Sequence, residues 1–504
     1  MHVVSREEMQ SIDQYTIKQI GLGGPVLMEN AGRAIYAAIE PDLSPETRVL
    51  VIIGKGNNGG DGFVVARQLL DSCAQAEVWL AVDPERITGD AAVHMNAYLA
   101  SGGEMRQIEE EHEQFSAQLD RAHLIVDALL GTGVRGAPYP EYAAVIEQMN
   151  HSEAETVSID LPSGVPANGE SFDHPAVLAN RTLTLECPKL AQFVLPAARY
   201  FGRVHVLPIG IPSAAYRAVG IQRRLRNRAE VIRTLPVRDP FSHKGSHGRG
   251  LLVAGAEGMP GAAFFAARSA LRSGIGLLKV CVPDAVKPVI GAGVPEAMYM
   301  SRHQLNFESI TGVAIGPGLG RGRDEEALVL RAVEESSEVP CVIDADALFH
   351  LKTHLDVLRA RKVPAVLSPH AGEMARLAGV SVKEVERSRF ALSQAFAQNN
   401  HVYLVLKGKY TIITAPDGRQ SVNPTGNAAL AKGGSGDVLT GILLAFLLQH
   451  EQIMEAVCNA VYVHGAAADE LVKRGHSLLD VLATDVIEMI PPVLHQLYSD
   501  TTGR

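Results

Sequence analysis

Short apolar runs recur along this chain, and each leads into a loop that contains glycine, asparagine or aspartate. The run at residues 48–53, RVLVII, leads into GKGNNGGDG, and the run at 312–315, GVAI, leads into GPGLG. Continuous apolar runs of this length are typical of strands that are buried on both faces of a parallel sheet. Segments with helical spacing lie between the runs, and this alternation predicts an α/β fold with mainly parallel sheets.

The chain has 504 residues, which is too long for one hydrophobic core, so we expect two or more domains. Its net charge of −10 and its isoelectric point near 6.0 disfavour a role at nucleic acid or at a membrane surface. The longest apolar run, residues 438–448, is too short to span a bilayer. We therefore expect small-molecule partners, with no nucleic acid and no membrane.

The cysteines and the start of the chain bear on the compartment. The five cysteines are scattered and none forms a CxxC pair, so neither a disulfide framework nor a zinc site is indicated. The first ten residues carry acidic side chains and no apolar run, unlike a secretory signal. Both features predict a cytoplasmic protein.

The loop GKGNNGGDG, residues 54–62, follows a predicted strand and precedes a predicted helix at 63–70. A strand, a glycine loop and a helix in this order are typical of a dinucleotide or phosphate site. The loop nevertheless lacks the GxGxxG fingerprint and the Walker lysine spacing. Its amide and carboxylate side chains suggest a bound cation, or a sugar or nicotinamide, as well as phosphate. The alternative is a tight turn, in which asparagine and glycine are favoured anyway.

Two further predicted strands end in an aspartate. Residues 124–136, LIVDALLGTGVRG, place Asp127 before a glycine loop, and residues 158–164, SIDLPSG, do the same with Asp160. In an open parallel sheet the ligand lies at the carboxyl ends of the strands, so the three loops are expected to converge there. Either aspartate alone is more simply explained as a loop cap.

Together, GNNGGDG, DALLGTG, IDLPSG and MENAG (residues 28–32) resemble NAD(P)H-hydrate epimerase over residues 1–212. The resemblance implies a Rossmann-like three-layer sandwich that binds hydrated NAD(P)H and potassium. It implies that potassium is held by Asn58, Asp127 and Ser163, whose oxygen atoms suit a hard ion. The implied substrate contacts are Asn57, Asn58, Gly59, Gly60, Asp61, Gly131, Thr132, Gly133, Val134, Arg135, Gly136, Ala137 and Asp160.

The second half holds a glycine turn, KGGSGD at residues 432–437, followed directly by the apolar helical run VLTGILLAF. Such a turn points backbone N–H groups and the positive end of a helix dipole at its ligand, which favours a phosphate. Asp437 is of no use for binding phosphate, but it is placed to take a proton from a hydroxyl that is about to be phosphorylated. For this turn alone, a plain helix start capped by the aspartate is the alternative.

Other predicted strands of this half end in GPGLG (316–320), DADAL (344–348) and SPHAGE (368–373). Beside KG (407–408) and KGGSGD, these motifs resemble ribokinase-like proteins, specifically ADP- or ATP-dependent NAD(P)H-hydrate dehydratase, over residues 226–504. The resemblance implies a nucleotide with Mg²⁺ and places Asp437 at the hydroxyl of the hydrate. The other implied hydrate contacts are Ala262, Gly318 and His370, and the implied nucleotide contacts are Lys407, Gly408, Lys409, Tyr410, Thr411 and Gly436.

A basic, proline-containing segment separates the two halves. We expect a first domain over residues 1–212, a linker over 213–225 and a second domain over 226–504. The run RRLR at 223–226 is expected to be part of a solvated connector, given the net acidity of the chain. Both domains are expected to be three-layer αβα sandwiches, and the family resemblance suggests a homo-oligomer.

The two halves make chemical sense together. Hydrated NAD(P)H carries a ring hydroxyl, which is a poor leaving group until it is phosphorylated. A kinase-like domain with Asp437 as base would phosphorylate it, with ADP the favoured donor, and elimination would restore NAD(P)H. That chemistry acts on the S hydrate alone, so a fused epimerase that interconverts the R and S hydrates would let one chain clear both. Asp160 is the candidate for assisting the epimerisation.

Two other functions share these motifs. The second half would release a stable phosphorylated product if it were a small-molecule kinase for sugars or vitamin precursors. The first half would bind a dinucleotide without turnover if it were a sensing module. A redox dehydrogenase is disfavoured, because the first glycine loop departs from the dinucleotide fingerprint.

Overall fold

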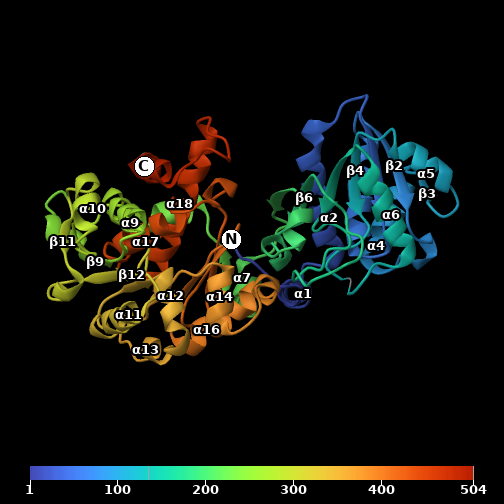
Figure 1. The fold of residues 1–504 in the computed structure, drawn as a ribbon. Coiled ribbons are helices and arrows are strands. Elements are labelled where there is room, and N and C mark those ends of the chain that lie inside the picture. The colour runs from blue at the N-terminus through green and yellow to red at the C-terminus, as the bar shows by residue number, and fades with distance from the viewer. Residues whose placement is uncertain (134, 503–504) are drawn as a thin grey trace. The chain divides into compact units, whose positions relative to one another are not determined.

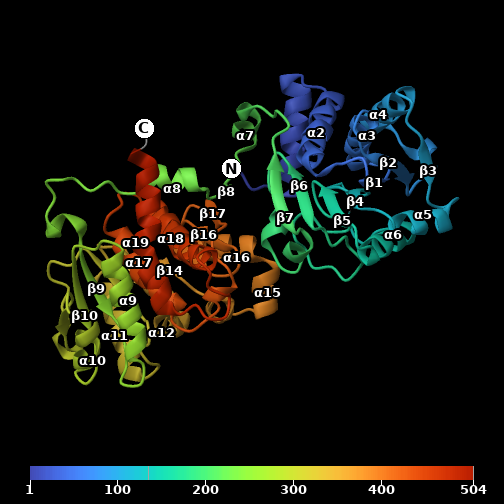
Figure 2. The ribbon, with the colours of Figure 1, turned by 90° about the horizontal axis from the view of Figure 1, so that it is seen from above.

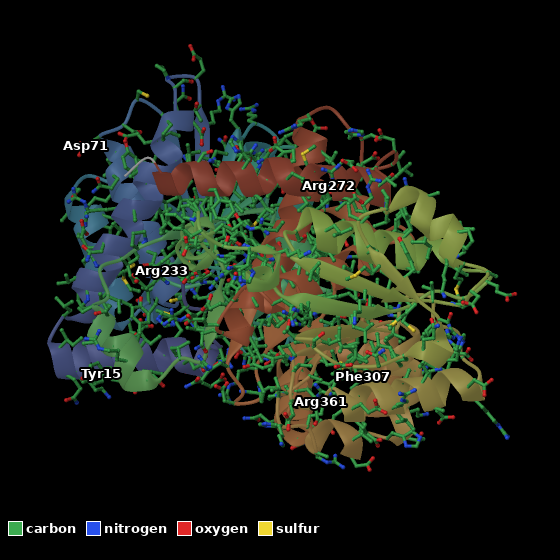
Figure 3. The ribbon with its side chains drawn as sticks, turned by 90° about the vertical axis from the view of Figure 1, so that its left-hand side faces the viewer. Tyr15, Asp71, Arg233, Arg272, Phe307 and Arg361 are labelled. Carbon is green, nitrogen blue, oxygen red and sulfur yellow. The ribbon has the colours of Figure 1, made fainter. Side chains whose placement is uncertain are left out.

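The computed structural model describes residues 1–133 and 135–502. The chain forms two compact units, one of His2–Ile221 and one of Met1 with Gln222–Arg504. Each unit is a sheet covered by helices on both faces, with side chains filling the space between the layers (Figure 1, Figure 3). The predicted α/β fold with mainly parallel sheets is thereby confirmed.

The first unit is built on a parallel sheet with the strand order β3-β2-β1-β4-β5-β6-β7. The chain moves outward from β1 in one direction and from β4 in the other, so the loops after these two strands diverge and leave a crevice at their carboxyl ends. The strands are β1 (Arg48–Ile53), β2 (Gln75–Leu80), β3 (Met105–Gln107), β4 (Leu124–Ala128), β5 (Glu155–Ile159), β6 (Arg181–Leu185) and β7 (Arg203–Leu207).

Alternating side chains of this sheet belong to two cores. Val49, Val51 and Ile53 pack with helices α2, α3 and α4, whereas Leu50 and Ile52 pack with α5 and α6. Figure 2 shows these two groups of helices on opposite faces of the sheet. The helices are α1 (Arg6–Tyr15), α2 (Gly24–Ile39), α3 (Asn57–Leu70), α4 (Gly89–Ala100), α5 (His112–Leu119), α6 (Pro140–His151) and α7 (Ser213–Val219), with a π-helical turn η1 (Thr16–Ile20) after α1.

The second unit has a longer sheet with the order β11-β10-β9-β12-β13-β14-β15-β16-β17-β8. It is parallel except where β16 runs antiparallel to both β15 and β17. The strands are β8 (Arg223–Leu225), β9 (Arg249–Val253), β10 (Leu277–Cys281), β11 (Met298–Met300), β12 (Gly312–Ile315), β13 (Cys341–Ile343), β14 (Val366–Leu367), β15 (Tyr403–Leu406), β16 (Thr411–Thr414) and β17 (Gln420–Asn423).

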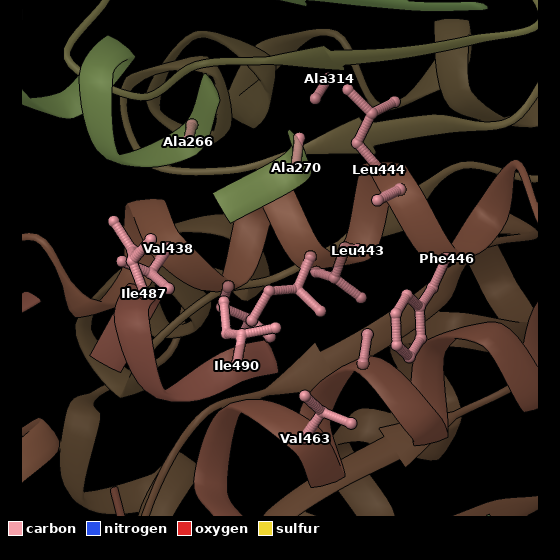
Figure 4. Packing of buried hydrophobic residues seen from close by; sticks show 14 of the residues in the cluster. Ala266, Ala270, Ala314, Val438, Leu443, Leu444, Phe446, Val463, Ile487 and Ile490 are labelled. Atoms are coloured by element: carbon pink, nitrogen blue, oxygen red, sulfur yellow. The ribbon is translucent and has the colours of Figure 1, made fainter. Parts of the chain in front are cut away.

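One face of this sheet packs against α9, α17, α18 and α19, and the other packs against helices from α11 to α16. Figure 4 shows side chains of α17, α18, α19 and α9 meeting in the first of these cores, with Leu443, Phe446 and Ile490 among them. The helices are α8 (Arg228–Thr234), α9 (Pro260–Arg272), α10 (Lys287–Gly293), α11 (Arg323–Glu335), α12 (Asp346–His350), α13 (Asp356–Arg359), α14 (Ala371–Ala378), α15 (Val382–Arg387), α16 (Arg389–Asn400), α17 (Ser435–Leu447), α18 (Ile453–Lys473) and α19 (Ala483–Thr502).

Several short turns of 3₁₀ helix connect these elements. They are η2 (Glu40–Asp42), η3 (Pro84–Arg86), η4 (Leu190–Phe193), η5 (Ala197–Tyr200), η6 (Lys244–His247), η7 (Arg302–Gln304), η8 (Leu351–Thr353) and η9 (Ala428–Leu430). Among the described helices, none is both long and apolar enough to cross a membrane.

The segment expected to be a linker, residues 213–225, is regular structure. It begins with α7, whose Ala215 is buried in a core of the first unit, and ends with β8, which pairs in parallel with β17 at the edge of the second sheet. Arg226, expected in a solvated connector, is 8% exposed and donates to Glu455 at 2.5 Å and Asn459 at 2.7 Å. The expectation of a solvated connector was therefore wrong for this run, because Arg223–Leu225 form an edge strand and Arg226 directly after it is buried in an ion pair.

Candidate functional site

A cavity of about 470 Å³ opens at the carboxyl ends of the strands of the first unit. Its floor comes from the loops after β1 and β4 and from Asp160, which directly follows β5. Helices α1 and α2 contribute Met9, Asp13 and Met28 to its wall. The cavity therefore lies at the crevice where the strand order reverses, which is the expected position for a ligand.

The glycine loop after β1 turns directly into α3, which begins at Asn57 rather than at the expected Phe63. Gly56 is the N-cap and provides no side-chain cap, so the first N–H groups of α3 stay available to a ligand in the cavity. A Cβ on Gly59 would lie 2.0 Å from the carbonyl oxygen of Gly54. Glycine is required there because the helix packs directly against the backbone of the strand end.

Oxygen atoms gather around the buried carboxyl of Asp127, which is 0% exposed. The Ser158 hydroxyl donates to it at 2.7 Å, and Ser163 donates from its backbone N at 2.9 Å and from its hydroxyl at 2.5 Å. Asn58 donates to the Leu130 carbonyl at 3.2 Å, beside this group. Burial raises the pKa of Asp127, and these hydrogen bonds oppose the rise.

Asp160 lines the cavity and is paired with Lys189, a residue that is fully buried. The carboxyl also accepts from Leu185 N at 2.9 Å and from the Thr184 hydroxyl at 3.3 Å. The backbone of Asp160 has a φ of 65°, in the left-handed region that non-glycine residues rarely occupy. Held in this way, its carboxylate is a fixed hydrogen-bond acceptor at the cavity wall.

Three further acids line the cavity, Asp13 from α1, Asp61 from α3 and Asp90 from α4. Burial raises the pKa of Asp13 to about 7, an effect that Lys189 opposes and the charge of Asp160 reinforces. Burial also raises the pKa of Asp61 well above its usual range, and the charges of Asp160 and Asp13 add to this effect. Such shifts arise where several carboxyls share a poorly solvated pocket, and they are typical of functional sites.

In the second unit, Asp437 lies in the first turn of α17, immediately after the glycine turn. Gly434 is the N-cap with a φ of 91°, and a Cβ there would lie 2.7 Å from the Phe265 ring. A glycine is therefore needed both for the conformation and for the space. The backbone N–H groups that open α17 are left without a side-chain cap, as an anion site requires.

Charged groups from other strand ends surround this turn. Asp344, after β13, accepts from Lys407 Nζ at 3.0 Å and from the Thr440 hydroxyl at 2.7 Å. Burial raises the pKa of Asp437 to about 7, with a further contribution from the charge of Asp344 and an opposing one from Lys407. Glu373 lies 3.9 Å from Lys407, so this lysine serves several carboxylates at once.

A buried arginine holds the turn between β15 and β16. Arg389 Nη2 donates to the carbonyl oxygens of Leu406 at 3.0 Å, Lys407 at 3.2 Å and Tyr410 at 3.2 Å. A Cβ on Gly408 would lie 2.7 Å from the same guanidinium, so the turn closes directly over it. The conformation of residues 407–410 therefore depends on one side chain from α16.

The remaining residues expected at the hydrate lie at neighbouring strand ends. A Cβ on Gly318 would come 2.8 Å from the Cβ of Ala262, which places the loop after β12 against the start of α9. His370 follows β14 and caps α14, accepting from Gly372 N at 3.0 Å through Nδ1. Its Nε2 lies 3.5 Å from Glu373.

Comparisons with known proteins identify a family for each half of the chain. A family described as "YjeF-related protein N-terminus" matches residues 24–191, and a family described as "NAD(P)H-hydrate dehydratase" matches residues 250–492. The bifunctional NAD(P)H-hydrate repair enzyme Nnr of Moorella thermoacetica is 38% identical over 99% of this chain and 97% of its own length. The Escherichia coli enzyme of the same name is 34% identical over 95% of this chain and 92% of its own length.

The chain belongs to the family of bifunctional NAD(P)H-hydrate repair enzymes. The resemblance seen in its motifs is confirmed, and the protein is an enzyme with an epimerase part and a dehydratase part. A ribokinase-like superfamily protein of Enterococcus faecalis V583 has the same fold over 55% of this chain and 96% of its own, with a TM-score of 0.51 and 25% identity. The ribokinase-like fold is thereby confirmed for the dehydratase part.

The epimerase unit of this repair enzyme brings many of the expected residues together. The cavity is lined by Asn57, Asn58, Asp61, Gly131, Thr132, Gly133 and Asp160. Gly59 and Gly60 are buried in α3 below it, whereas Arg135, Gly136 and Ala137 are exposed and do not line it. Val134, also expected at the substrate, lies outside the described residues.

In the dehydratase unit, Lys407 and Gly436 lie together, since a Cβ on Gly436 would come 3.5 Å from Lys407 Nζ. The Nζ atom of Lys409, also expected at the nucleotide, donates to the Gly426 carbonyl at 3.1 Å. Thr411 is buried at the start of β16, and its hydroxyl donates to Gly408 at 3.3 Å. Both side chains therefore shape the turn of residues 407–411.

Sequence reasoning missed three residues of these sites. Lys189 lies in the segment between β6 and η4, and Asp13 in an amphipathic helix, so neither belongs to a glycine loop. Asp344 stood out as the acidic end of a strand but received no role. Its partners, Lys407 and Thr440, lie 63 and 96 residues away in the sequence. Only folding brings them together.

Proposed function

We propose that the second unit dehydrates the S hydrate of NADH and NADPH with ADP as phosphoryl donor, and that the first unit interconverts the R and S hydrates. The dehydration proposal rests on the position of Asp437. This residue lies in the first turn of α17, directly after an uncapped glycine turn. A base at this point lies beside the phosphate that the turn would bind. Its raised pKa, about 7, suits a group that must accept a proton near neutral pH.

In this proposal the hydrate lies between Ala262, Gly318 and His370, with its hydroxyl at Asp437. The nucleotide lies along residues 407–411 and reaches Gly436 with its terminal phosphate. Lys407 would neutralise charge on that phosphate, since its ammonium lies within 3.5 Å of a Cβ on Gly436. Asp344 orients this ammonium by accepting from it at 3.0 Å.

Magnesium fits this arrangement as a companion of the nucleotide. Among the described residues, no group of three His, Cys, Asp or Glu side chains is arranged to hold a metal ion. The nearby Asp346 is also engaged, since Arg321 donates to it at 2.8 Å and Gly320 N at 3.0 Å. Mg²⁺ would therefore be held mainly by phosphate oxygens, where it would neutralise charge during transfer.

Potassium fits the site around Asp127 in the first unit. This carboxyl is fully buried, and no cationic side chain among the described residues pairs with it. Asn58, Ser163 and the Leu130 carbonyl supply further oxygen atoms beside it. A monovalent cation would balance the buried charge and fix the loop after β4, which forms one wall of the cavity.

The same cavity would hold the hydrated ring, with Asp160 facing its hydroxyl. The test of both activities is the recovery of NADH absorbance from a mixture of hydrate epimers, with ADP, with ATP and with neither. Complete recovery with one nucleotide supports both steps and identifies the donor. Recovery that stops at the fraction of one epimer removes the epimerase assignment and leaves the dehydratase.

The family matches disfavour the other function that these motifs allow, a small-molecule kinase in the second unit with a dinucleotide sensor in the first. Such a kinase would release a stable phosphorylated product, whereas a dehydratase releases free phosphate with NAD(P)H. Assaying phosphate beside absorbance separates the two. Absence of recovery with either nucleotide would favour the kinase.

A further inference from the structure

The epimerase cavity contains the carboxyl of Asp61, whose surroundings are not explained by substrate binding alone. Asp61 is 7% exposed and lines the cavity, yet its carboxyl forms no hydrogen bond or ion pair with the residues that the structure describes. A buried polar group is usually satisfied by a partner, and an exception in a pocket is a functional candidate. Its free side chain is therefore available to a bound substrate.

Asp160 in the same cavity is the opposite case. The ammonium of Lys189, the backbone N of Leu185 and the Thr184 hydroxyl all direct donors at its carboxyl. Together these contacts fix the direction of the Asp160 carboxyl. The two acids therefore differ in surroundings, and such a difference is how one site supplies both an acid and a base.

We propose that Asp160 is the base and Asp61 the acid of a ring-opening epimerisation, with Lys189 as the residue that positions Asp160. This inference rests on the proposed epimerase function and specifies its chemistry. The carbon that carries the hydroxyl is also bonded to the ring nitrogen. Opening the bond between them makes this carbon an aldehyde, which has lost its configuration and can close on either face.

The step balances without any co-reactant. Asp160 takes the hydroxyl proton, the C–O bond becomes C=O, and the carbon–nitrogen bond breaks with its electron pair moving to nitrogen. Asp61 gives that nitrogen a proton. After rotation about the neighbouring carbon–carbon bond, nitrogen returns its proton to Asp61 and attacks the other face of the aldehyde, and the new alkoxide takes the proton back from Asp160.

The charges around Asp61 agree with an acid role. Burial is the main cause that raises its pKa, and the facing groups are Asp13 on α1, Asp160 after β5 and Lys189 before η4. The two aspartates raise the pKa further and the lysine lowers it. Asp61 is therefore protonated, and able to donate, at a pH where an exposed aspartate is ionised.

The experiment uses the full-length protein with pure R hydrate and no nucleotide, and follows the R and S hydrates by chromatography. We expect Asp61→Asn and Asp160→Asn each to slow the interconversion by about 10² or more. Asp71→Asn is the matched control, because Asp71 is exposed at the C-terminal end of the same helix α3 (Figure 3). It should keep the wild-type rate.

Two measurements on the wild-type protein need no variant and remain decisive if Asp61→Asn does not fold. In ¹⁸O-labelled water, ring opening retains the original oxygen, whereas loss and return of hydroxide would add one solvent oxygen for each inversion. The rate should also fall as the pH rises through the raised pKa of Asp61, because this acid then loses its proton. Label incorporated at each inversion, or a folded Asp61→Asn variant at the wild-type rate, would overturn the proposal. A wild-type protein that does not interconvert the epimers would instead refute the proposed function.

Discussion

At the level of single residues, the ionisation of Asp437 sets the pH range of dehydration. A base must be ionised to act, and burial raises the pKa of this carboxyl to about 7. The dehydration rate should therefore rise with pH through about 7 and be lost progressively below it. Asp437→Asn should lower the rate by about 10² or more and remove this rise. The measurement is NADH recovery from S hydrate across pH at saturating nucleotide.

The matched control for Asp437 is Glu451→Gln, since Glu451 is an exposed carboxyl shortly after the end of the same helix. It should retain both the rate and the pH profile of the wild type. A folded Asp437→Asn variant with wild-type turnover would exclude Asp437 as the base. A wild-type rate that does not change between about pH 5 and 8 would show that its ionisation does not limit dehydration.

The buried carboxyl of Asp127 leads us to expect that potassium affects the stability and the epimerisation rate of the protein. Asp127→Asn removes the charge that a cation would balance while keeping the shape of the side chain. Potassium should raise the melting temperature of the wild type and accelerate its epimerisation, because a ligand stabilises the state that binds it. Both responses should be lost in the variant, measured against choline at constant ionic strength.

Asp120→Asn provides the comparison for potassium, because Asp120 is exposed at the end of α5 in the same unit. It should respond to potassium like the wild type. Equal potassium responses of Asp127→Asn and the wild type, in melting temperature and in rate, would remove the metal assignment of Asn58, Asp127 and Ser163 together.

At the level of secondary-structure elements, the turn between β15 and β16 is held by one side chain of α16. Arg389 donates to three carbonyl oxygens of this turn from a planar guanidinium, a geometry that an ammonium does not reproduce. Arg389→Lys should therefore loosen the turn and raise the KM for the nucleotide about tenfold or more, equivalent to one lost charged hydrogen bond. Epimerisation should be unaffected.

The control at this element is Arg387→Lys, since Arg387 is exposed at the end of α15, two residues earlier. Steady-state dehydration at varied ADP and ATP measures both variants. If Arg389→Lys lowers the melting temperature without changing the KM, then the turn is structural and the nucleotide binds elsewhere.

The central strands were predictable from sequence because they are buried on both faces and read as continuous apolar runs. Residues 48–53 and 312–315, for example, were predicted with the bounds that β1 and β12 have. The edge strand β7 was missed, because its sequence RVHVL interrupts the apolar residues with Arg203 and His205 and gives no continuous apolar run. The start of α3 was placed too late, because glycines in its first turns resemble a loop in sequence but allow close packing in the structure.

The site was predictable only where residues cluster in sequence. The loops after β1 and β4 were predicted from glycine and aspartate residues at strand ends, and both loops line the cavity. The residues that face these loops were not predicted, because Lys189 and Asp13 lie in segments without a glycine or strand-end motif. The pairing of Asp160 with Lys189 also spans 29 residues. Sequence patterns identify the edge of the sheet, whereas charge pairing across that edge depends on tertiary structure.

On the scale of the whole molecule, each unit has its own sheet and its own cores on both faces. A unit that buries its own apolar residues is expected to fold alone. The two chemical steps also need no shared residue, since the epimerase cavity is lined entirely by residues of the first unit. In the proposed function, the fused chain then combines two catalysts that act on epimers of one damaged cofactor.

This independence makes a prediction about where the chain can be cut. A fragment of residues 1–221 should fold and interconvert the R and S hydrates, whereas a fragment of residues 1–212 should be markedly less stable. The shorter fragment lacks α7, which brings the buried Ala215 into a core and lets Tyr216 donate to Glu186. Removing α7 exposes that core and leaves the Glu186 carboxyl with fewer donors.

Thermal melting and chromatographic epimer assays on the two fragments test this boundary. Equal melting temperatures would show that α7 is dispensable and that the first domain ends near residue 212. An inactive but folded 1–221 fragment would show that epimerisation needs the second unit. Activity in 1–221 alone, without any nucleotide, would separate the epimerase from a dinucleotide sensor, because a sensor binds the hydrate without changing the ratio of its epimers.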